Sequence, residues 1–226
     1  MIWITGDTHG DWIHRVNMDS FPEQREMSKD DYVIILGDFG IWRDSPQQRW
    51  YLNWLEERNF TTLFIDGNHE NYDILYSYPV EEWHGGKVHF IKPSIIHLMR
   101  GQVFEIDDLK FFTFGGASSH DISDGVLEID DPRVKEWRDD PDKMYRINHI
   151  SWWEREMPNQ KEMNEGIKNL AEHNDKVDFI LTHCTASSTA ALLSHGLYKP
   201  DKLTNYLEEI KCNVDYKRWL CGHYHD

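Results

Sequence analysis

The sequence of 226 residues has no apolar run that approaches the roughly 20 residues needed to cross a bilayer. Its first residues also lack the basic and apolar segments of a secretory leader. Cysteine is scarce, and the three cysteines, Cys184, Cys212 and Cys221, have no paired spacing, which is typical of a reduced, cytoplasmic protein. Glycine and proline number only 14 and 8, which excludes collagen-like and low-complexity chains. We therefore expect a folded cytoplasmic protein with no membrane segment.

The sequence has few basic residues, 24 against 40 acidic ones, and its formal net charge is −16. A surface that binds a nucleic-acid strand neutralises phosphates with lysine and arginine, so this balance argues against long nucleic acid as a partner. Phosphate chemistry stays open, because bound divalent cations can reverse the local potential. The charge therefore favours small molecules over polyanionic strands as partners.

Hydrophobic residues make up 39% of the chain and aromatic residues 13%, enough for a sizeable core. Five short apolar runs end in polar or glycine-containing turns and are typical of strands buried on both faces: residues 2–5, 32–36, 62–65, 179–182 and 218–221. Helical spacing predicts helices over residues 46–58, 159–173 and 202–210, the first with Ser45 as its N-cap. Alternating strands and helices indicate an α/β fold, which we expect to form a single domain over residues 1–226.

The middle of the chain has a different pattern. Four closely spaced apolar runs, 88–91, 95–99, 102–106 and 109–114, predict antiparallel hairpins rather than crossover connections. Residues 115–158 follow with weak periodicity, and from position 121 to 142 they contain nine acidic and three basic residues. Because so long a loop is uncommon without a function, we expect residues 115–158 to form a partly ordered flap over a functional site. A solvated surface segment is the alternative.

Side chains able to bind metals follow each of the five predicted strands. The blocks are Gly6-Asp7-Thr8-His9-Gly10, Gly37-Asp38-Phe39-Gly40, Asp66-Gly67-Asn68-His69-Glu70, Thr182-His183 and Gly222-His223-Tyr224-His225. In open α/β sheets ligands collect at the carboxyl ends of the strands, so the blocks should converge on one crevice. Two carboxylates, one amide and four imidazoles form a ligand set suited to manganese, iron, zinc or nickel, and too large for one ion. We therefore expect two divalent transition-metal ions.

The order of these blocks resembles that of the calcineurin-like metallophosphoesterase superfamily, whose pattern is D-x-H, G-D, G-N-H-[D/E], a later H, and G-H-x-H. The match extends from Asp7 to His225, and five ordered blocks are far more specific than any one of them. Residues 115–118 and 152–158 look like those of small bacterial and phage members. The resemblance implies a four-layer α/β/β/α sandwich of two mixed sheets flanked by helices, with a dinuclear metal site at the carboxyl ends of the strands.

Carried over block by block, the resemblance implies a role for each residue. Two sets of ligands share one bridging carboxylate: Asp7, His9 and His225 for the first metal, Asn68, His183 and His223 for the second, and Asp38 for both. His69 would contact the phosphoryl oxygen of the substrate or protonate the leaving group. Asp66 and Glu70 are expected to orient the histidines from behind.

The implied chemistry follows from charge. Two cations about 3.5–4 Å apart would clamp the phosphoryl oxygens and lower the pKa of a bridging water, so that hydroxide exists near neutral pH. That hydroxide would attack phosphorus in line while the cations absorb the charge developing on the equatorial oxygens. The implied activity is hydrolysis of a phosphodiester or phosphomonoester of a small molecule or nucleotide, with manganese as the expected metal in vitro.

Four further residues are candidates for contacting the substrate. Arg43 and Arg146 could each hold a phosphate oxygen through two hydrogen bonds, and His120 and His149 lie in the expected flap. For each arginine the alternative is a surface salt bridge. For each histidine it is an ordinary surface or core position.

Two other functions stay open at this point. The protein Ser/Thr phosphatases of the superfamily carry G-D-x-V-D-R-G at the second block, whereas this chain has Gly-Asp-Phe-Gly-Ile-Trp-Arg over residues 37–43, which disfavours a protein phosphatase. A non-catalytic scaffold of the same fold would tend to lose ligands, whereas every ligand position and His69 are present. Family members usually continue with further strands after the last block. Since this chain ends one residue after His225, we expect a truncated or naturally short form, of undetermined oligomeric state.

Overall fold

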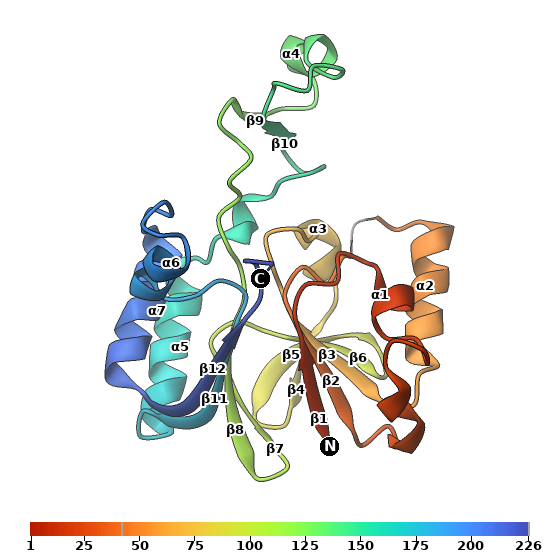
Figure 1. Cartoon of the computed structure of the whole chain (residues 1–226), viewed down its shortest axis with the longest axis vertical. Coiled ribbons are helices and arrows are strands. Elements are labelled where there is room, and N and C mark those ends of the chain that lie inside the picture. The colour runs from red at the N-terminus through yellow and green to blue at the C-terminus, as the bar shows by residue number, and fades with distance from the viewer. Residues whose placement is uncertain (42, 226) are drawn as a thin grey trace.

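The computed structural model describes residues 1–41 and 43–225, and in this part the chain is a mixed α/β protein (Figure 1). Its largest sheet has six strands in the order β1-β2-β3-β6-β5-β4. They are β1 (Ile2–Thr5), β2 (Tyr32–Leu36), β3 (Thr61–Ile65), β4 (Val80–Trp83), β5 (Gly86–Lys92) and β6 (Ile95–Leu98). The first four strands in this order are parallel, and β5 and β4 are added antiparallel.

A second sheet has four strands in the order β12-β11-β8-β7. They are β7 (Gln102–Ile106), β8 (Leu109–Phe114), β11 (Lys176–Thr182) and β12 (Asp215–Cys221). Strands β8, β11 and β12 are parallel, whereas β7 and β8 form an antiparallel hairpin. The expected hairpins are therefore confirmed, and they are divided between the sheets, with β5 and β6 in the first and β7 and β8 in the second.

Helices pack on both sheets. Those on the first sheet are α1 (Trp12–Arg15), α2 (Pro46–Glu56) and α3 (Tyr72–Leu75), and those on the second are α5 (Gln160–Glu172) and α7 (Lys202–Asn213), with α6 (Ser187–Leu193) beside α7. Two short 3₁₀ helices span Pro22–Glu26 and Glu154–Glu156. Helix α2 begins as expected, because the Ser45 side chain accepts a hydrogen bond from the backbone N–H of Gln48. No helix in the described residues is long and apolar enough to cross a membrane.

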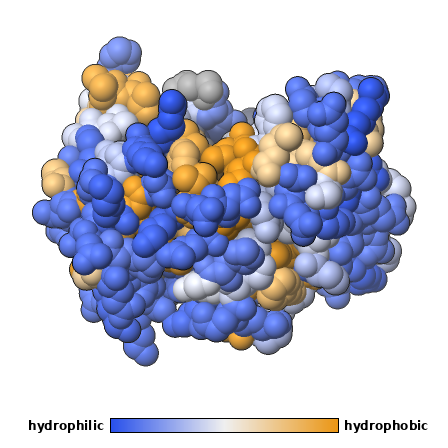
Figure 2. All heavy atoms as spheres, turned by 90° about the horizontal axis from the view of Figure 1, so that it is seen from below, coloured by the Kyte–Doolittle hydropathy of each residue, from blue (hydrophilic) through white to orange (hydrophobic). Residues whose placement is uncertain are grey.

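Three apolar clusters form the core. Alternate residues of β2 belong to different clusters: Val33 and Ile35 pack with α1 and α2, while Ile34 and Leu36 pack with strands of the second sheet. A third cluster joins β8 and β11 to α5 and α7. Burying each such side chain contributes roughly 1.5–3 kcal/mol. At the lower end of the strands, hydrophobic residues gather between two hydrophilic sides, as Figure 2 shows.

The prediction that all five strands are buried on both faces is wrong for two of them. Strands β1 and β12 lie at the edges of their sheets, each paired on one side only within the described residues. Trp3 in β1 is 38% exposed, and β12 carries exposed charged residues such as Lys217. Short apolar runs do not reveal whether a strand is central or at an edge, because pairing depends on distant segments.

Residues 115–158, called the arm below, contain β9 (Gly125–Leu127), α4 (Pro132–Glu136) and β10 (Tyr145–Ile147). Strands β9 and β10 pair with each other as a separate two-stranded sheet. Figure 1 shows this part standing away from the two large sheets, at the end where the C-terminus lies. The arm is thus ordered into elements, while its closure over a substrate stays a prediction.

Candidate metal centre

The five motif blocks follow the carboxyl ends of β1, β2, β3, β11 and β12. Because these strands are parallel within their sheets, their ends meet on one side of the molecule, below the arm. The side chains are contributed by loops, and the strands position the loops. This arrangement brings together residues as distant in sequence as Asp7 and His223, whose backbone N–H donates to Asp7 Oδ1 over 2.9 Å.

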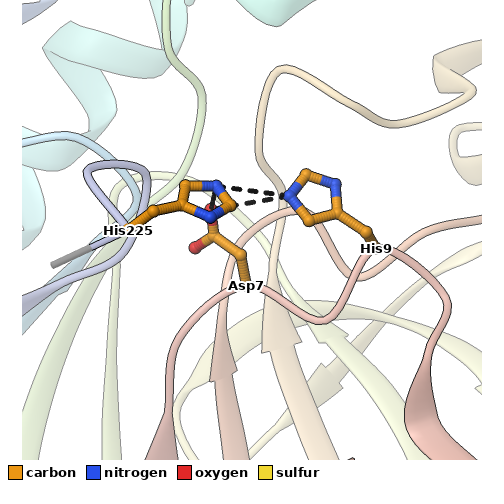
Figure 3. Close-up of side chains that lie close together, drawn as sticks. All are labelled: Asp7, His9 and His225. Carbon is orange, nitrogen blue, oxygen red and sulfur yellow. Dashed lines mark hydrogen bonds and ion pairs between the residues drawn. The ribbon is translucent and has the colours of Figure 1, made fainter.

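One group consists of Asp7, His9 and His225, which point toward one another (Figure 3). His225 Nε2 lies 3.2 Å from Asp7 Oδ2 and 3.4 Å from His9 Nε2. His9 Nε2 is 3.9 Å from the same Asp7 oxygen. One donor atom from each residue thus lies within 4.8 Å of the other two, a spacing at which all three could bind one cation.

A second group surrounds His183, whose side chain is fully buried. Its Nε2 lies 3.4 Å from Asp38 Oδ1 and 3.2 Å from Asn68 Oδ1. The other carboxylate oxygen of Asp38 lies 3.7 Å from His9 Nε2 in the first group. Asp38 therefore presents one oxygen to each group, which is the geometry of a bridging ligand.

Hydrogen bonds fix the tautomer of His183. Its Nδ1 lies 2.8 Å from the carbonyl oxygen of Leu36, so Nδ1–H donates there and Nε2 faces Asp38 and Asn68. Burial lowers the pKa of His183, but the Asp38 and Asp7 carboxylates outweigh burial and raise it to about 9. The site therefore attracts positive charge, and a divalent cation would take the place of that proton.

His223 lies between His183 and His120. Its ring centroid is 4.9 Å from that of His183, and its Nε2 is 3.3 Å from His120 Nε2. Burial lowers the pKa of His223 to about 3, which keeps the imidazole in the neutral form that binds metals. His120, predicted to contact substrate, thus contacts a candidate ligand, and its ring stacks on that of Tyr198 at 5.4 Å.

His69 lies beside the first group. Its backbone N–H donates to Asp38 Oδ1 over 2.8 Å, and its ring centroid is 5.4 Å from that of His9. The side chain is half-buried, and burial lowers its pKa. This places a titratable imidazole next to the candidate ligands, in a position to reach a bound substrate.

Several site residues adopt the left-handed backbone conformation that L-residues rarely use. They are His9 (φ 47°), Asp38 (φ 44°), His223 (φ 70°) and His225 (φ 54°). Such conformations cost of order 1–3 kcal/mol each and concentrate at functional sites. The strain is consistent with loops shaped to bring donor atoms together.

Two glycines of the motif blocks are required by close approach. A Cβ on Gly37, whose φ is +90°, would lie 2.1 Å from His183 Nδ1. A Cβ on Gly67 would lie 2.0 Å from Asp38 Oδ1. The glycines before Asp38 and Asn68 thus make room for side chains of the neighbouring blocks.

Glu70 and Asp66 support backbone and loops rather than the candidate ligand histidines, which corrects the expectation that they orient those rings. Buried Glu70 accepts hydrogen bonds from the backbone N–H groups of residues 39, 40 and 41, directly after Asp38. Buried Asp66 accepts from Arg100 and Tyr72 and lies 3.2 Å from His97 Nε2. These contacts hold the loops that carry Asp38 and Asn68.

The other substrate candidates lie around the centre. Arg43 is exposed and lines a cavity of about 250 Å³ that His9 also lines. Arg146, in the arm, forms an ion pair with Asp121, and charges on both residues influence the pKa of His69. His149 differs from the other three candidates, because it lies at the surface with its Nδ1 2.8 Å from Asp73 Oδ2.

Three buried polar residues near the centre were not predicted from the sequence. Ser119 lies 3.4 Å from Asn68 Nδ2, Glu156 accepts hydrogen bonds from Ser119, and Arg100 pairs with Asp66. None belongs to a motif block, and each is far along the chain from its partner. The available signals were Arg100, a charged residue in an otherwise apolar stretch after β6, and the position of Glu156 within the family-like residues 152–158.

The donor set fits metal ions. Carboxylates, imidazoles and an amide oxygen converge from five loops, and the described residues contain two Asp/His groups spaced for a cation: Asp7, His9 and His225, and Asp7, Asp38 and His183. Although burial opposes ionisation, His183 and His69 hold the pKa of Asp38 well below its usual range, so it is available as a ligand.

A comparison with protein families agrees with this geometry. The family model described as "Calcineurin-like phosphoesterase" matches residues 1–226, the whole chain. Comparisons with curated proteins and with solved structures give no match. The family is generally hydrolytic and usually binds two divalent metals, and the mixed sheets flanked by helices are consistent with its fold. The chain belongs to the calcineurin-like phosphoesterase family.

Proposed function

We propose that the protein is a dinuclear-metal-dependent hydrolase of small-molecule or nucleotide phosphoesters. The observation that carries the proposal is the position of Asp38, which faces His183 with one carboxylate oxygen and His9 with the other. A carboxylate placed between two sets of ligands is what a pair of cations requires. The four-layer α/β/β/α arrangement is part of the proposal and is supported by the three apolar clusters.

The ligands divide into two sets that share Asp38. Asp7, His9 and His225 would hold the first cation, and Asn68, His183 and His223 the second. When bound, the two cations would supply charge to neutralise phosphoryl oxygens and lower the pKa of a coordinated water. We expect manganese to support activity in vitro, and iron, zinc and nickel suit the same donor set.

His69 is proposed to contact a phosphoryl oxygen or to pass a proton to the leaving group. Its ring lies beside that of His9, and its backbone is tied to Asp38, so it is held at the edge of the ligand cluster. Burial lowers its pKa, which favours the neutral imidazole, and the N–H of that form can donate a hydrogen bond to a phosphoryl oxygen.

The surroundings favour a small substrate. One cavity of about 250 Å³ lies beside His9 and includes Arg43 and Tyr51. A second, of about 470 Å³, is lined by Asp7, His225 and Arg15. The second volume lies within the roughly 300–1,000 Å³ typical of small-molecule sites, and the first lies just below that range. The net charge of −16 disfavours long nucleic acid.

Four further residues are considered as contacts to the substrate. Arg43 is suited to hold a phosphate oxygen, and Arg146 and His120 lie where they could reach a bound ester. His149 is less suited, because Asp73 occupies its ring nitrogen. A cytoplasmic location is supported by three cysteines without disulfides, two of them at least partly accessible.

Turnover of chromogenic esters tests the proposal. The full chain, loaded with Mn²⁺, should hydrolyse bis-p-nitrophenyl phosphate or p-nitrophenyl phosphate, and at least one member of a panel of cyclic nucleotides, dinucleotides and nucleoside phosphates. The Asp38→Asn variant serves as the matched control and should be inactive. Absence of turnover on every substrate, with two ions bound, would contradict hydrolysis and favour a non-catalytic scaffold.

A further inference from the structure

Glu156 is a buried acid that the proposed chemistry does not use. Its side chain is only 2% exposed, yet both carboxylate oxygens are occupied by one residue. Oε1 accepts from the backbone N–H of Ser119 over 2.9 Å, and Oε2 accepts from the Ser119 hydroxyl over 2.6 Å. A buried acid with two bonds to a single serine indicates that the serine has to be held in one orientation.

The direction of the hydrogen bonds follows from what each group can do. As a carboxylate Glu156 can only accept, so the hydroxyl proton of Ser119 points toward it. The Ser119 oxygen is then an acceptor for Asn68 Nδ2, which lies 3.4 Å away. Since the amide nitrogen of Asn68 is drawn to Ser119, the amide oxygen faces His183 Nε2 at 3.2 Å.

This orientation matters because the two ends of an amide have nearly the same size and opposite chemistry. An amide oxygen can bind a cation, whereas the NH₂ group presents two protons and cannot. Packing alone distinguishes the two orientations poorly, so the hydrogen-bond partners decide between them. In this chain the partner on the nitrogen side of the amide is Ser119, and the hydroxyl proton of Ser119 is directed toward Glu156.

The same two residues close the base of the arm. Ser119 lies near its beginning and Glu156 near its end, 37 positions apart. Buried Arg100 adds to this closure by donating to the carbonyl oxygens of Arg155, at 2.8 Å, and Glu156, at 3.3 Å. Arg100 also pairs with Asp66, two residues before Asn68. The base of the arm and the Asn68 loop are therefore one hydrogen-bonded unit.

We propose that Ser119 and Glu156 are positioning residues that set the amide of Asn68 with its oxygen toward the second metal position. The base of the arm thereby becomes part of the support for that ion, while the first position, formed by Asp7, His9 and His225, does not depend on it. This inference rests on the proposed function, because it assumes two metal positions of which Asn68 serves one.

The Glu156→Gln variant tests the direction of the hydrogen bonds from Asn68 through Ser119 to residue 156, because glutamine has nearly the same shape as glutamate. Its amide Nε2 can replace Oε2 and donate to the Ser119 oxygen, which turns the serine proton toward Asn68. The Asn68 amide would then rotate and present NH₂ to the metal position. Manganese titration of the metal-free full chain by calorimetry should show one of the two ions losing 10- to 100-fold in affinity, the usual effect of altering such an outer partner. The affinity for the other ion should be unchanged.

Ser119→Ala is the second variant, since it removes the acceptor for Asn68 Nδ2 and leaves Glu156 in place. It should weaken the same single ion. A matched control exists elsewhere in the chain, where Glu208 accepts from both the backbone N–H and the hydroxyl of Ser188. Glu208→Gln and Ser188→Ala alter an equivalent pair that contacts no candidate ligand, and they should leave both affinities unchanged.

The outcomes separate this inference from the proposed function. If the unaltered protein binds two ions and both Glu156→Gln and Ser119→Ala do so with equal affinity, the positioning role is wrong and the function stands. If both variants weaken both ions together and lower the thermal midpoint without metal, the pair only stabilises the fold, and the role is again wrong. If the unaltered protein binds no second ion, the proposed function fails and this inference fails with it.

Discussion

Asp38 is the residue on which the two ligand groups depend. Its oxygens lie 3.4 Å from His183 Nε2 and 3.7 Å from His9 Nε2, and a Cβ on Gly67, in the loop after β3, would collide with it. Replacing it with asparagine leaves the apolar strands intact but removes the shared negative charge. We expect Asp38→Asn to lose at least one ion and to lower turnover by at least about 100-fold. Metal analysis and chromogenic ester assays measure both effects. Normal turnover with two ions bound would mean that Asp38 is not a ligand.

Substitution of His69 distinguishes a role in metal binding from a role in catalysis. It contacts Asp38 through its backbone N–H, a bond that any side chain at this position preserves. We therefore expect His69→Ala to retain both ions while turnover falls about 10²–10⁴-fold, as for the loss of a general acid–base group. His149→Ala, which alters a surface histidine bonded to Asp73, is the control and should change turnover little. A His69→Ala protein with one ion missing would show that His69 is a ligand.

How far these residues could be predicted depends on whether they lie in a local pattern. All seven candidate ligands belong to short blocks that follow apolar runs, so they could be placed at the carboxyl ends of the predicted strands. They are Asp7, His9, Asp38, Asn68, His183, His223 and His225. Ser119, Glu156 and Arg100 act through partners tens of residues away, and no spacing reveals such pairs. Glu70 was predicted to orient the histidines, whereas in the folded chain it accepts hydrogen bonds from backbone N–H groups.

At the level of elements, the strands that position the site were predicted unevenly, because β11 and β12 each begin three residues before the predicted runs 179–182 and 218–221. Strands β1 and β2 begin and end at the predicted residues, because buried apolar runs bounded by turns are a strong local signal. The exposure of β1 and β12 was not predicted, since edge positions depend on pairing. Strand β4 was missed as well, because its sequence Val-Glu-Glu-Trp is half acidic and its pairing with β5 is decided by the turn between them.

A buried ion pair between Asp66 and Arg100 stabilises the loop that follows β3. Asp66 and Arg100 are both almost fully buried, and among the described residues the next carboxylate from Arg100 is that of Glu162, at 3.6 Å. Removing one member of such a pair leaves the other uncompensated, so Asp66→Asn should lower the free energy of unfolding by about 3–5 kcal/mol. Asp44→Asn breaks the exposed pair with Arg49 and should cost about 0–1 kcal/mol. Urea unfolding at pH 7 measures both, and equal losses would contradict the account.

The same pair predicts a pH dependence. Burial raises the pKa of Asp66, but Arg100 and His97 outweigh burial and hold it well below its usual range in the folded state. The unfolded chain takes up a proton near pH 4, so the stabilisation by Asp66 is complete above that pH and declines as the pH falls below it. The difference in stability between the unaltered protein and Asp66→Asn should therefore be constant from pH 7 to 5 and shrink below pH 4. A difference that grows on acidification would have the wrong sign.

At the scale of the whole molecule, we expect the arm and the net charge of −16 to limit which substrates approach the candidate metal centre. If the arm screens the centre, changing its Asp130, Asp131, Asp139 and Asp140 to asparagine should raise activity on a single-stranded oligonucleotide relative to a small chromogenic diester. The gain should be largest at low salt, since the Debye length is roughly 10 Å at 0.1 M and about 3 Å at 1 M. Asp131 caps α4, and asparagine preserves that cap.

A control for the arm lies at the opposite end of the molecule. Amide substitutions at exposed Glu81, Glu82, Asp107 and Asp108, on β4 and in the turn between β7 and β8, remove the same charge far from the arm. They should change the activity ratio less than the arm substitutions do. Equal effects of the two sets at every ionic strength would mean that only net charge matters and that the arm points away from incoming substrate.

The proposed dinuclear centre is tested by the number of metal ions that activity requires. Metal-free protein titrated with Mn²⁺, with binding followed by calorimetry and hydrolysis of bis-p-nitrophenyl phosphate or p-nitrophenyl phosphate followed in parallel, should bind two ions per chain. Because Asp38 faces both ligand groups, turnover should stay near background through the first equivalent and rise with the second. Saturation at one ion per chain, or full turnover in the metal-free protein, would contradict the account.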